Sequence, residues 1–521
     1  MKRTGYRYRT GRAADRYDCI VIGSGIGGLC SAALQARLGR KVCVLEQHYT
    51  AGGFTHSYER KGFEWDVGVH YIGEVHKPHS TLRRIFDVIS DGQLKWAPMD
   101  PVYDRIIIGE RTVDFVAGRE NLAASLKTHF PQEAQAIDAY LALTERVAKS
   151  AQKFHAGQAM PRLAGKAYNA VRPLMVPKEC FQTVREVLER LTRNQELISV
   201  LTGQWGDYGM VPSAASFMMH ASVVKHYFSG GNYPVGGSWR IADSIIPVIR
   251  AAGGEVFTYA RVKQILVENG RARGVLMANG DRLYADTVVS AAGARITFGE
   301  LLPQAERERF GYAGKLAKVK PSGAHLCLYA GFRGSAAALG LPRTNLWVYP
   351  SIDHEGNVAR FAADLDAPFP MLYISFPSAK DPEWDRHYPD KSTVEVLTLG
   401  PWDKFAKWEK TIWHKRGADY EALKEKLKRR LLDALYQQLP QLRGALAYAE
   451  LSTPLTTSWF QRNNRGEIYG LDHDVQRYRQ DWLHPITPVK GLYLTGQDVV
   501  SAGVGGALMG GYLTTSAMLG G

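Results

Sequence analysis

The order of apolar and polar positions predicts an α/β chain that opens with a strand–helix–strand unit. Residues 18–22 (DCIVI) form a short apolar run typical of a buried parallel strand, and residues 41–45 (KVCVL) form a second. Between them, apolar residues recur at helical spacing up to Gly39, a common helix end. The first 45 residues therefore predict a complete βαβ unit.

The rest of the chain alternates between helical and β-rich segments. Most of residues 77–224 is predicted as helix and loop, with helical periodicity over 134–150 and 183–191. Candidate strands lie at 256–257, 262–267, 273–277 and 287–290, and a second β-rich region spans 324–399. Residues 420–439 predict an amphipathic helix, and 491–495 predict a strand before a Gly-rich loop and a final helix.

Composition places the chain among ordinary globular proteins and leaves open which anionic partner it meets. The 521 residues suggest two or three domains, and 45% are hydrophobic while 22% are charged. The formal net charge of +14 favours nucleic acid, an anionic membrane surface or an acidic substrate. Because the basic residues are dispersed and accompany no recognisable reading motif, no nucleic-acid partner is predicted.

The cysteines predict neither disulfides nor a metal site. There are five, an odd number, and no CxxC or Cys/His zinc spacing occurs among them. They are predicted to be inert core thiols in a reducing compartment. They are Cys19, Cys30, Cys43, Cys180 and Cys327.

Two basic segments raise the question of a membrane surface. No run approaches the roughly 18 apolar residues needed to span a bilayer, and the basic N-terminus lacks the apolar core of a secretory signal. Residues 1–16 are predicted to be a solvated, disordered tail, with an arm that touches anionic lipid as the alternative. Residues 151–178 carry basic and apolar residues and no acid, so they fit either an interfacial segment or a solvated loop.

A dinucleotide signature follows the first predicted strand. Gly23, Gly25 and Gly28 fit G-x-G-x-x-G, in which missing Cβ atoms let the backbone approach a pyrophosphate at a helix N-terminus. Glu46 ends the second strand, where a carboxylate accepts hydrogen bonds from ribose hydroxyls. The same carboxylate would repel a 2′-phosphate, so NADP is not expected at this site.

Three further features favour FAD over NAD. Gly52 and Gly53 allow a second loop to reach the pyrophosphate and the flavin end, and Asp66-Val67-Gly68 follows soon after. Near the C-terminus, Thr495-Gly496-Gln497-Asp498 precedes glycines at a helix start. An aspartate at that point can bind ribityl hydroxyls, and the helix N-terminus can stabilise negative charge on a reduced flavin.

These motifs resemble the flavoprotein superfamily of amine oxidases, phytoene desaturases and carotenoid isomerases. The resemblance is nearest to the branch of all-trans-retinol saturase and carotenoid isomerase, and it is spread over almost the whole chain. The matching blocks are DCIVIGSGIGGL (18–29), VLEQHYTAGGFTHSY (44–58), DVGVHYIGE (66–74), NYPVGGSWRIADSIIPVIRAAGGEV (232–256), EIYGLDHD (467–474) and LYLTGQDVVSAGVGGALMGG (492–511).

The resemblance implies a Rossmann-like FAD-binding domain with an inserted β-sheet and a helical substrate domain. The implied domains are a basic tail (1–16), a discontinuous FAD-binding domain (17–76, 225–300 and 485–521), a helical cap with possible membrane contact (77–224) and a substrate-binding domain (301–484). The implied cofactor contacts are Gly23, Gly25, Gly28, Glu46, Gln47, Gly52, Gly53, Phe54, Val262, Asp498, Gly505 and Gly506. Because Gln47 and His48 stand where many relatives carry Arg, a charge contact from that position to the phosphates stays open.

The same resemblance implies flavin redox chemistry on a long apolar lipid such as a retinoid, carotenoid or unsaturated acyl chain. His70, Tyr71 and Glu74 are the candidate catalytic residues, and Tyr469 is a candidate for the pocket wall. His70 could donate a proton or could only orient its loop. Electrons could come from NAD(P)H, a quinone or a redox protein. The implied localisation is cytoplasmic with peripheral membrane association.

Saturation and isomerisation lead among the possible reactions, and three alternatives remain open. One is desaturation of a carotenoid or fatty acyl lipid. The second is amine oxidation, which the block at 232–256 disfavours. The third is a lipid carrier of the same fold without enzymatic activity, which the complete flavin set disfavours.

Overall fold

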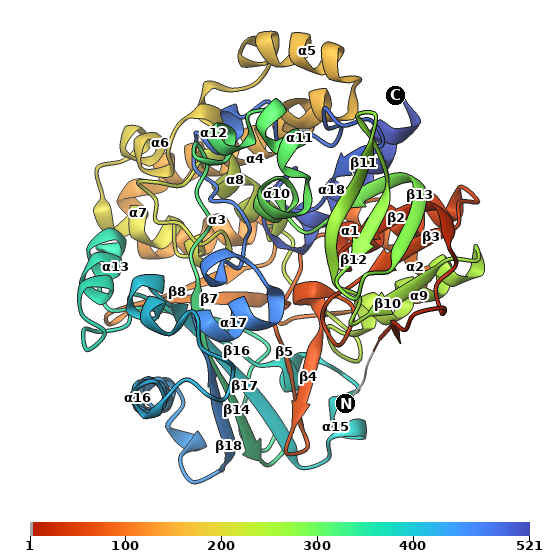
Figure 1. The fold of residues 1–521 in the computed structure, drawn as a ribbon. Helices are drawn as coiled ribbons and strands as arrows, with labels where there is room; N and C mark the ends of the chain where they lie inside the picture. Colours follow the sequence, from red (N-terminus) through yellow and green to blue (C-terminus); the bar gives the residue numbers. More distant parts are fainter. Residues whose placement is uncertain (1–3, 521) are drawn as a thin grey trace.

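The computed structural model describes residues 4–520, which form two β-sheets and a layer of helices (Figure 1). The first sheet has the order β1-β10-β3-β2-β13-β12-β11, and β19 pairs with β13. Its strands are β1 (Tyr6–Arg7), β2 (Arg16–Ile22), β3 (Val42–Leu45), β10 (Glu255–Thr258), β11 (Val262–Glu268), β12 (Arg271–Met277), β13 (Arg282–Ser290) and β19 (Leu492–Leu494). Thus strands from both ends of the chain and from its middle meet in one sheet.

The first sheet is parallel at its centre and antiparallel at one edge. β3, β2, β13 and β19 run parallel, whereas β11, β12 and β13 form an antiparallel meander. Three helices, α1 (Ile26–Arg37), α9 (Arg240–Ala251) and α18 (Gly503–Leu519), share a hydrophobic core with β2 and β3. Since the parallel strands are covered on both faces, their apolar runs lack polar alternation.

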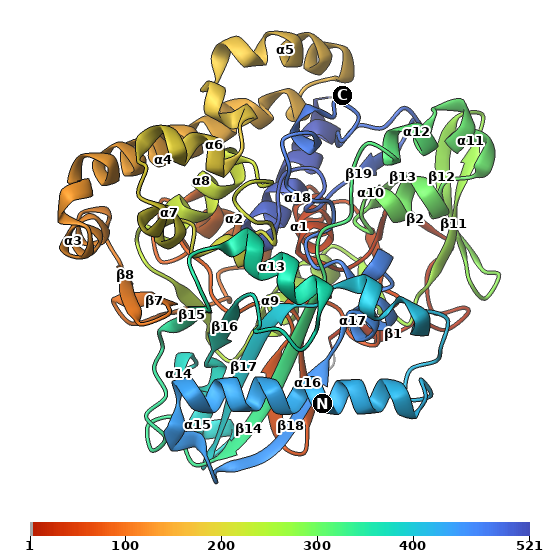
Figure 2. The same ribbon diagram turned by 90° about the vertical axis from the view of Figure 1, so that its left-hand side faces the viewer.

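The second sheet has the order β18-β14-β17-β16-β15-β7-β8. Its strands are β7 (Val102–Ile108), β8 (Arg111–Val116), β14 (His325–Arg333), β15 (Asn345–Tyr349), β16 (Leu372–Ser375), β17 (Lys391–Leu399) and β18 (Leu446–Ser452). The long helix α16 (Ala418–Gln438) crosses one face of this sheet, as Figure 2 shows, and buries Leu427 and Leu431 against β14 and β17.

A helical layer covers the other face of the second sheet. It contains α3 (Arg119–His129), α4 (Ala134–His155), α5 (Arg162–Met175), α6 (Val184–Leu191), α7 (Gln195–Leu201) and α8 (Phe217–His226). Side chains of α4 and α8 share a core with Ile106 of β7 and Trp347 of β15. α5 lies at the outside of this layer in both views.

Shorter elements link these layers. They are the hairpin β4 (Ser57–Arg60) and β5 (Phe63–Asp66), the pair β6 (Trp96–Pro98) and β9 (Asn232–Pro234), and the helices α2 (Thr81–Ser90), α10 (Ala294–Ile296), α11 (Gln304–Arg309), α12 (Tyr312–Leu316), α13 (His354–Ala363), α14 (Pro377–Lys380), α15 (Trp384–His387) and α17 (Pro454–Gln461). The Asp66 backbone amide of β5 donates to Glu395 of β17 at 2.8 Å, so this hairpin ties the nucleotide motif to the second sheet.

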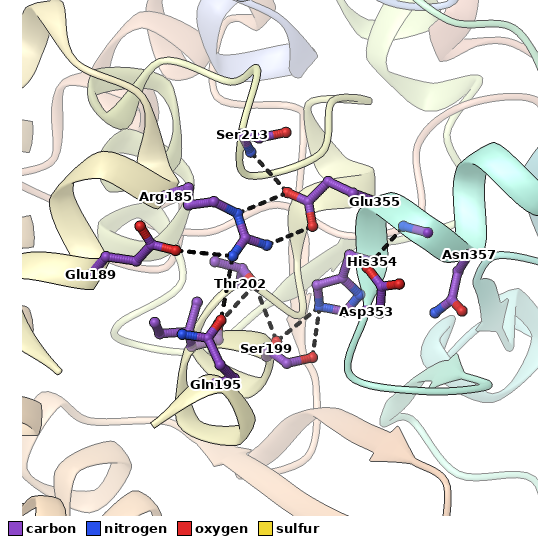
Figure 3. A network of polar contacts seen from close by, with 12 residues as sticks. Arg185, Glu189, Gln195, Ser199, Thr202, Ser213, Asp353, His354, Glu355 and Asn357 are labelled. Atoms are coloured by element: carbon purple, nitrogen blue, oxygen red, sulfur yellow. Dashed lines mark hydrogen bonds and ion pairs between the residues drawn. The ribbon is translucent and has the colours of Figure 1, made fainter. Parts of the chain in front are cut away.

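Polar contacts also join the helical layer to α13 (Figure 3). Arg185 of α6 donates to both carboxylate oxygens of Glu355, at 2.6 and 3.3 Å, and the Ser213 amide donates to the same carboxylate at 3.0 Å. The ring of His354 lies 3.0 Å from the hydroxyl and carbonyl oxygens of Ser199 in α7. These contacts fix the helical layer against the second sheet.

Two sequence expectations differ from the structure. Residues 4–16 are not a solvated tail, because β1 pairs in parallel with β10 and the Tyr8 hydroxyl donates to Asp281 at 2.8 Å. The segment 77–224 is not only helix and loop, because β7 and β8 form a hairpin in the second sheet. Gly109 has a positive φ of 58° at that turn, and the buried positions on either side alternate as in a half-buried hairpin.

Candidate functional site

One cavity lies between the two sheets and draws residues from every layer of the fold. Its volume is about 330 Å³, within the range of small-molecule sites. One half is formed by the glycine turn after β2, the end of β3 and the start of α18. The other half is formed by residues of β15, β16 and β17 and by the segment around Tyr469. A bound molecule can therefore contact both sheets at once.

The glycine turn leaves room for a phosphate group. Gly25 caps the N-terminus of α1 without a side-chain hydrogen bond, and the first turn of α1 holds no acidic residue. A Cβ atom built on Gly25 would meet no protein atom within 4 Å, so it would project into the cavity. Free backbone N–H groups and the helix dipole therefore face an open space that suits a pyrophosphate.

Close packing explains Gly28 at the start of α1 and Gly53 in the second glycine loop. A Cβ atom on Gly28 would lie 2.2 Å from the carbonyl oxygen of Gly23, which no side chain tolerates. Gly53 has a φ of 56°, and its Cβ would lie 2.9 Å from the Cα of Gly25. The second glycine loop thus closes directly against the first.

Glu46 lies at the end of β3 with its carboxylate held in place. Oε2 accepts from the backbone N–H and the hydroxyl of Ser24, at 2.9 and 2.7 Å, and Oε1 accepts from the His48 amide at 2.8 Å. A carboxylate offers about four acceptor positions, so one remains for a ribose hydroxyl. Glu46 lines the cavity and is only 8% exposed. Its geometry fits the predicted role.

Asp498 joins three segments where β19 ends. Oδ1 accepts from the Leu471 amide at 3.0 Å and Oδ2 from the Ala294 amide at 2.7 Å. These bonds hold the carboxylate in the cavity wall and leave acceptor positions for the hydroxyls of a ribityl chain. Together with the glycine cradle and Glu46, this donor and acceptor set fits FAD.

Most of the predicted cofactor residues line the cavity, but the two glycines of α18 do not. Gly505 and Gly506 lie in the first turns of α18, and the cavity is lined there by Gly503, Val504 and Ala507 instead. Gly506 is explained by packing, since its Cβ would lie 2.2 Å from the Ser501 carbonyl oxygen. The residues proposed as cofactor contacts that line the cavity are Gly23, Gly25, Gly28, Glu46, Gln47, Gly52, Gly53, Phe54, Val262 and Asp498.

The far half of the cavity is a mainly apolar chamber. We call it the aromatic chamber and define it by Trp347, Met371, Tyr373, Leu397, Leu399 and Tyr469. The Tyr469 hydroxyl donates to the Gly206 carbonyl at 3.0 Å, so this ring is fixed in the wall. Side chains that can carry a charge also line it, among them His70, Asp207, His325 and Glu467. The chamber thus offers an extended apolar surface with a few placed polar groups.

His70 lies at the boundary between the two halves and is neutral at pH 7. Burial, together with the nearby Lys380, lowers the pKa of His70 to about 3. Its Nδ1 lies 2.8 Å from Oε2 of Glu395, and burial raises the pKa of Glu395 to about 8. This pair therefore carries no net charge, and His70 holds no imidazolium proton to give at neutral pH.

The structure does not bring the other two predicted catalytic residues into the cavity. Tyr71 lies one layer behind it, and its hydroxyl is within 2.9 Å of Asp104 and 2.8 Å of Asp207. Glu74 forms ion pairs with Lys77 and Lys225, at 3.1 and 3.3 Å, away from the cavity.

Sequence reasoning missed a polar cluster at the chamber, in which Asp207 lines the cavity and Lys380 and Glu395 lie outside its lining. Asp207 stands alone in a loop-like stretch, GQWGDYG, and Lys380 and Glu395 lie far from any motif. No sequence signal marks them as neighbours, because they come from the helical layer, α14 and β17. Among residues 4–520, no group of three or more His, Cys, Asp or Glu side chains is arranged to hold a metal ion.

Known proteins share the sequence of this chain over almost its whole length. The family described as flavin containing amine oxidoreductase matches residues 26–519. All-trans-retinol 13,14-reductase of Rattus norvegicus is 36% identical over 98% of this chain and 87% of its own length. A Danio rerio protein named inactive all-trans-retinol 13,14-reductase is 33% identical over the same shares. Prolycopene isomerase of Daucus carota is 26% identical over 92% of this chain and 76% of its own length.

Solved structures share the fold at low sequence identity. An oxidoreductase from Methanosarcina mazei has a TM-score of 0.63 and 16% identity, covering 95% of this chain and 99% of its own. Putrescine oxidase has a TM-score of 0.63 and 15% identity, covering 97% and 99%. The predicted fold class, α/β with a Rossmann-like nucleotide-binding unit, an inserted β-sheet and helices, is confirmed by these likenesses.

Proposed function

Because this chain belongs to the family of flavin-containing amine oxidoreductases, we propose that it acts on a C=C bond of a long apolar polyene. The chain is an FAD-dependent oxidoreductase, and the predicted resemblance is confirmed by the family match and by relatives at about 35% identity. When bound, FAD supplies hydride transfer at its isoalloxazine ring. The substrate class and the direction of the reaction form the proposal.

The observation that carries this proposal is the continuity of the cavity. The FAD cradle opens directly into the aromatic chamber, so an apolar chain in the chamber can reach the flavin end of the cofactor. Aromatic walls suit a flat polyene because their rings offer apolar faces without unpaired polar groups. The relatives named for retinol reduction and prolycopene isomerisation act, by their names, on substrates of this class.

Reduction of a retinoid-like polyene is the leading reaction. The protein binds the polyene, holds it against the flavin site and excludes water with the chamber walls. Amine oxidation fits less well, because the wall of the chamber is mainly apolar. A charged ammonium group is costly to bring into such surroundings. The electron source is a nicotinamide, a quinol or a redox protein.

The test is anaerobic photoreduction of the purified holoenzyme followed by mixing with all-trans-retinol or a poly-cis carotene. We expect retinol to gain two hydrogens while the flavin absorbance recovers. Altered geometry without a change of mass would indicate an isomerase. If no polyene reacts and a primary amine bleaches the oxidised flavin instead, the proposal is wrong.

A pair of variants makes this test specific to the chamber. Met371→Lys places a charge among the aromatic walls, and we expect it to abolish turnover while the flavin spectrum is retained. Ile352→Lys places the same charge at a position that is 43% exposed, and we expect it to change neither property. Equal activity of the two variants would contradict the position of the substrate.

We further propose that α5 rests on an anionic membrane surface from which the lipid substrate is drawn. The exposed fractions of Leu163 and Leu174 are 84% and 89%, and Val171 and Met175 are each 47% exposed. Residues 151–178 hold five basic and no acidic residues. An apolar face with basic flanks is typical of an interfacial helix. Across residues 4–520, no helix is both long and apolar enough to cross a bilayer.

A further inference from the structure

We propose that Asp207 is the acid that protonates the polyene. This inference rests on the proposed function, since it names the proton donor of that same site. Asp207 ends the short 3₁₀ turn Trp205–Asp207, which follows α7, and it lines the aromatic chamber. Among the described residues, its carboxyl group accepts from no backbone amide and forms no ion pair with a cation, and its neighbour is the Tyr71 hydroxyl.

The Tyr71 hydroxyl has one hydrogen and lies between the carboxyl groups of Asp104 and Asp207, so one of these two groups must hold a proton. The Tyr71 hydroxyl oxygen lies 2.8 Å from Oδ2 of Asp207 and 2.9 Å from Oδ2 of Asp104. A hydroxyl has one hydrogen to donate, so it can serve only one of these oxygens. The other short contact needs a hydrogen from a carboxyl group, because two bare oxygen atoms would repel each other.

The surroundings of Asp104 make it the acid that stays ionised. Its Oδ1 accepts from the side-chain amide of Asn345 at 2.9 Å, and its Oδ2 accepts from the side-chain amide of Gln204 at 2.7 Å. Burial raises the pKa of Asp104, and these two side-chain amides, Tyr71 and the charge of Lys380 reduce this rise without cancelling it. Asp207 accepts from no side-chain amide, so the proton resides on Asp207. The protonated Asp207 then donates to the Tyr71 hydroxyl oxygen, and the Tyr71 hydroxyl donates to Asp104.

The groups around Asp207 keep it protonated. Burial raises the pKa of Asp207 well above its ordinary value, the charge of Asp104 raises it further, and Tyr71 and Lys380 act in the opposite direction. The remaining titratable neighbours are tyrosines whose own pKa values burial raises, so they are neutral. These tyrosines are Tyr71, Tyr103, Tyr208, Tyr227, Tyr349, Tyr373 and Tyr469.

Two other candidate donors, Lys380 and His70, are set aside on different grounds. Lys380 donates to three oxygen atoms, those of the His70 carbonyl at 3.0 Å, the Ser375 hydroxyl at 2.8 Å and the Asn345 side chain, so its three hydrogens are all engaged. It does not line the cavity. His70 lines the cavity, but burial lowers its pKa to about 3 and it has no imidazolium proton at pH 7.

The proposed step balances as an addition of one hydride and one proton to the C=C bond. One carbon receives a hydride, whose electron pair comes from a nicotinamide, quinol or redox-protein donor by way of FAD. The π electrons then take the proton of Asp207, so a C–H bond forms, the O–H bond breaks and Asp207 becomes a carboxylate. Rotation about its Cβ–Cγ bond turns the protonated oxygen from Tyr71 toward the chamber, and a proton from water restores the acid.

The first test reads the proton itself and needs no substrate. Infrared spectra of the FAD-loaded protein are recorded about one pH unit above 8, the pKa of Glu395, so that Glu395 is mainly ionised. We expect a carboxylic-acid carbonyl band, sensitive to D₂O, that is absent in Asp207→Asn. In Asp104→Asn the same band should disappear at a lower pH than in the wild type, because the charge of Asp104 raises the pKa of Asp207. A band that persists in Asp207→Asn would overturn the assignment.

The second test measures saturation by the pre-reduced holoenzyme against pH. We expect Asp207→Asn to slow the step by roughly 10²–10⁴-fold while it still binds and photoreduces FAD. We expect Asp207→Glu to recover part of the rate. Because the charge of Asp104 raises the pKa of Asp207, Asp104→Asn should move the loss of rate at high pH to lower pH. A positioning role for Asp207 alone would not produce this shift.

The two tests separate the failure of this inference from the failure of the proposed function. If the wild-type enzyme saturates a polyene and Asp207→Asn does so equally fast, only the assignment of Asp207 is wrong. If the reduced wild-type enzyme leaves every polyene unchanged, the proposed function is wrong and the donor role fails with it, whatever the infrared spectra show.

Discussion

Gly28 lies in the first turn of α1, where the helix touches the turn after β2 backbone to backbone. Its missing side chain is required by the carbonyl oxygen of Gly23, 2.2 Å from the place of a Cβ atom. The neighbouring Gly25 faces open cavity instead, so its missing side chain leaves space for the ligand. Within one motif, therefore, one glycine serves the fold and another serves the cofactor.

This difference predicts two outcomes for one type of substitution. Gly28→Ala should lower the free energy of unfolding by about 2 kcal/mol or more, because backbone must move, and should weaken FAD binding as well. Gly25→Ala should lose FAD with little loss of stability. Gly314→Ala, whose Cβ would meet nothing within 4 Å, is the control. Flavin absorbance and urea unfolding measure both quantities, and equal effects at Gly25 and Gly28 would contradict the assignment.

α5 carries the two most exposed large hydrophobic side chains among residues 4–520, Leu163 and Leu174. It packs on the end of α4 through the Tyr168 hydroxyl, which donates to the Lys153 carbonyl, and on the turn after α4 through Gly165, which lies against Gly157. Exposed leucines in a folded protein commonly mark an interaction surface when they cluster with basic residues. The sequence was compatible with either an interfacial segment or a solvated loop here, and the structure shows a helix.

The proposed role of α5 predicts a change in membrane binding without a change in stability. Leu163→Glu combined with Leu174→Glu should abolish sedimentation with phosphatidylserine vesicles. The melting temperature should stay the same, because both side chains are more than 80% exposed. Ile412→Glu, at a position 58% exposed elsewhere on the surface, should leave binding intact. Unchanged sedimentation of the double variant would exclude α5 as the contact.

At the scale of the whole molecule, the cavity depends on how the helical layer sits against the second sheet. Arg185 donates two hydrogen bonds to the Glu355 carboxylate, and the backbone amide of Ser213 donates a third (Figure 3). Burial alone would raise the pKa of Glu355, but Arg185 and Ser213 lower it below the ordinary value. This ion pair is part of what positions Asp207, because α6, α7 and the turn after α7 belong to the same layer.

The ion pair predicts a pH dependence of stability. A carboxyl group whose pKa is lower in the folded protein stabilises it above the unfolded value, about 4.5, and this contribution is lost as the pH falls. Glu355→Gln and Arg185→Met should each cost about 1–2 kcal/mol at pH 7 and less in acid. A double-mutant cycle measures the coupling energy of this pair. The same kind of cycle on the exposed pair Arg429 and Glu425 should give a coupling energy of under about 0.5 kcal/mol. Equal coupling energies for the two pairs would contradict the prediction.

The sequence by itself determined the nucleotide-binding half of this protein. The strand–helix–strand unit, the glycine turn, Glu46 and Asp498 were all predicted, because their constraints are local: a backbone turn, a helix start and an acid at a strand end. The hairpin β7–β8 had a local signal as well, in its alternating buried positions and its turn at Gly109, although the segment was predicted as helix and loop.

Only the tertiary structure decided the chemistry of the substrate half. Tyr71, Asp104, Asp207 and Lys380 come from four separate segments, and their neighbourhood depends on how two sheets and a helical layer pack. Their protonation states depend on burial, which one-dimensional spacing does not encode. The same packing left Glu74 outside the cavity and buried His70 in its neutral form, so the proton donor could be assigned only after the chain was folded.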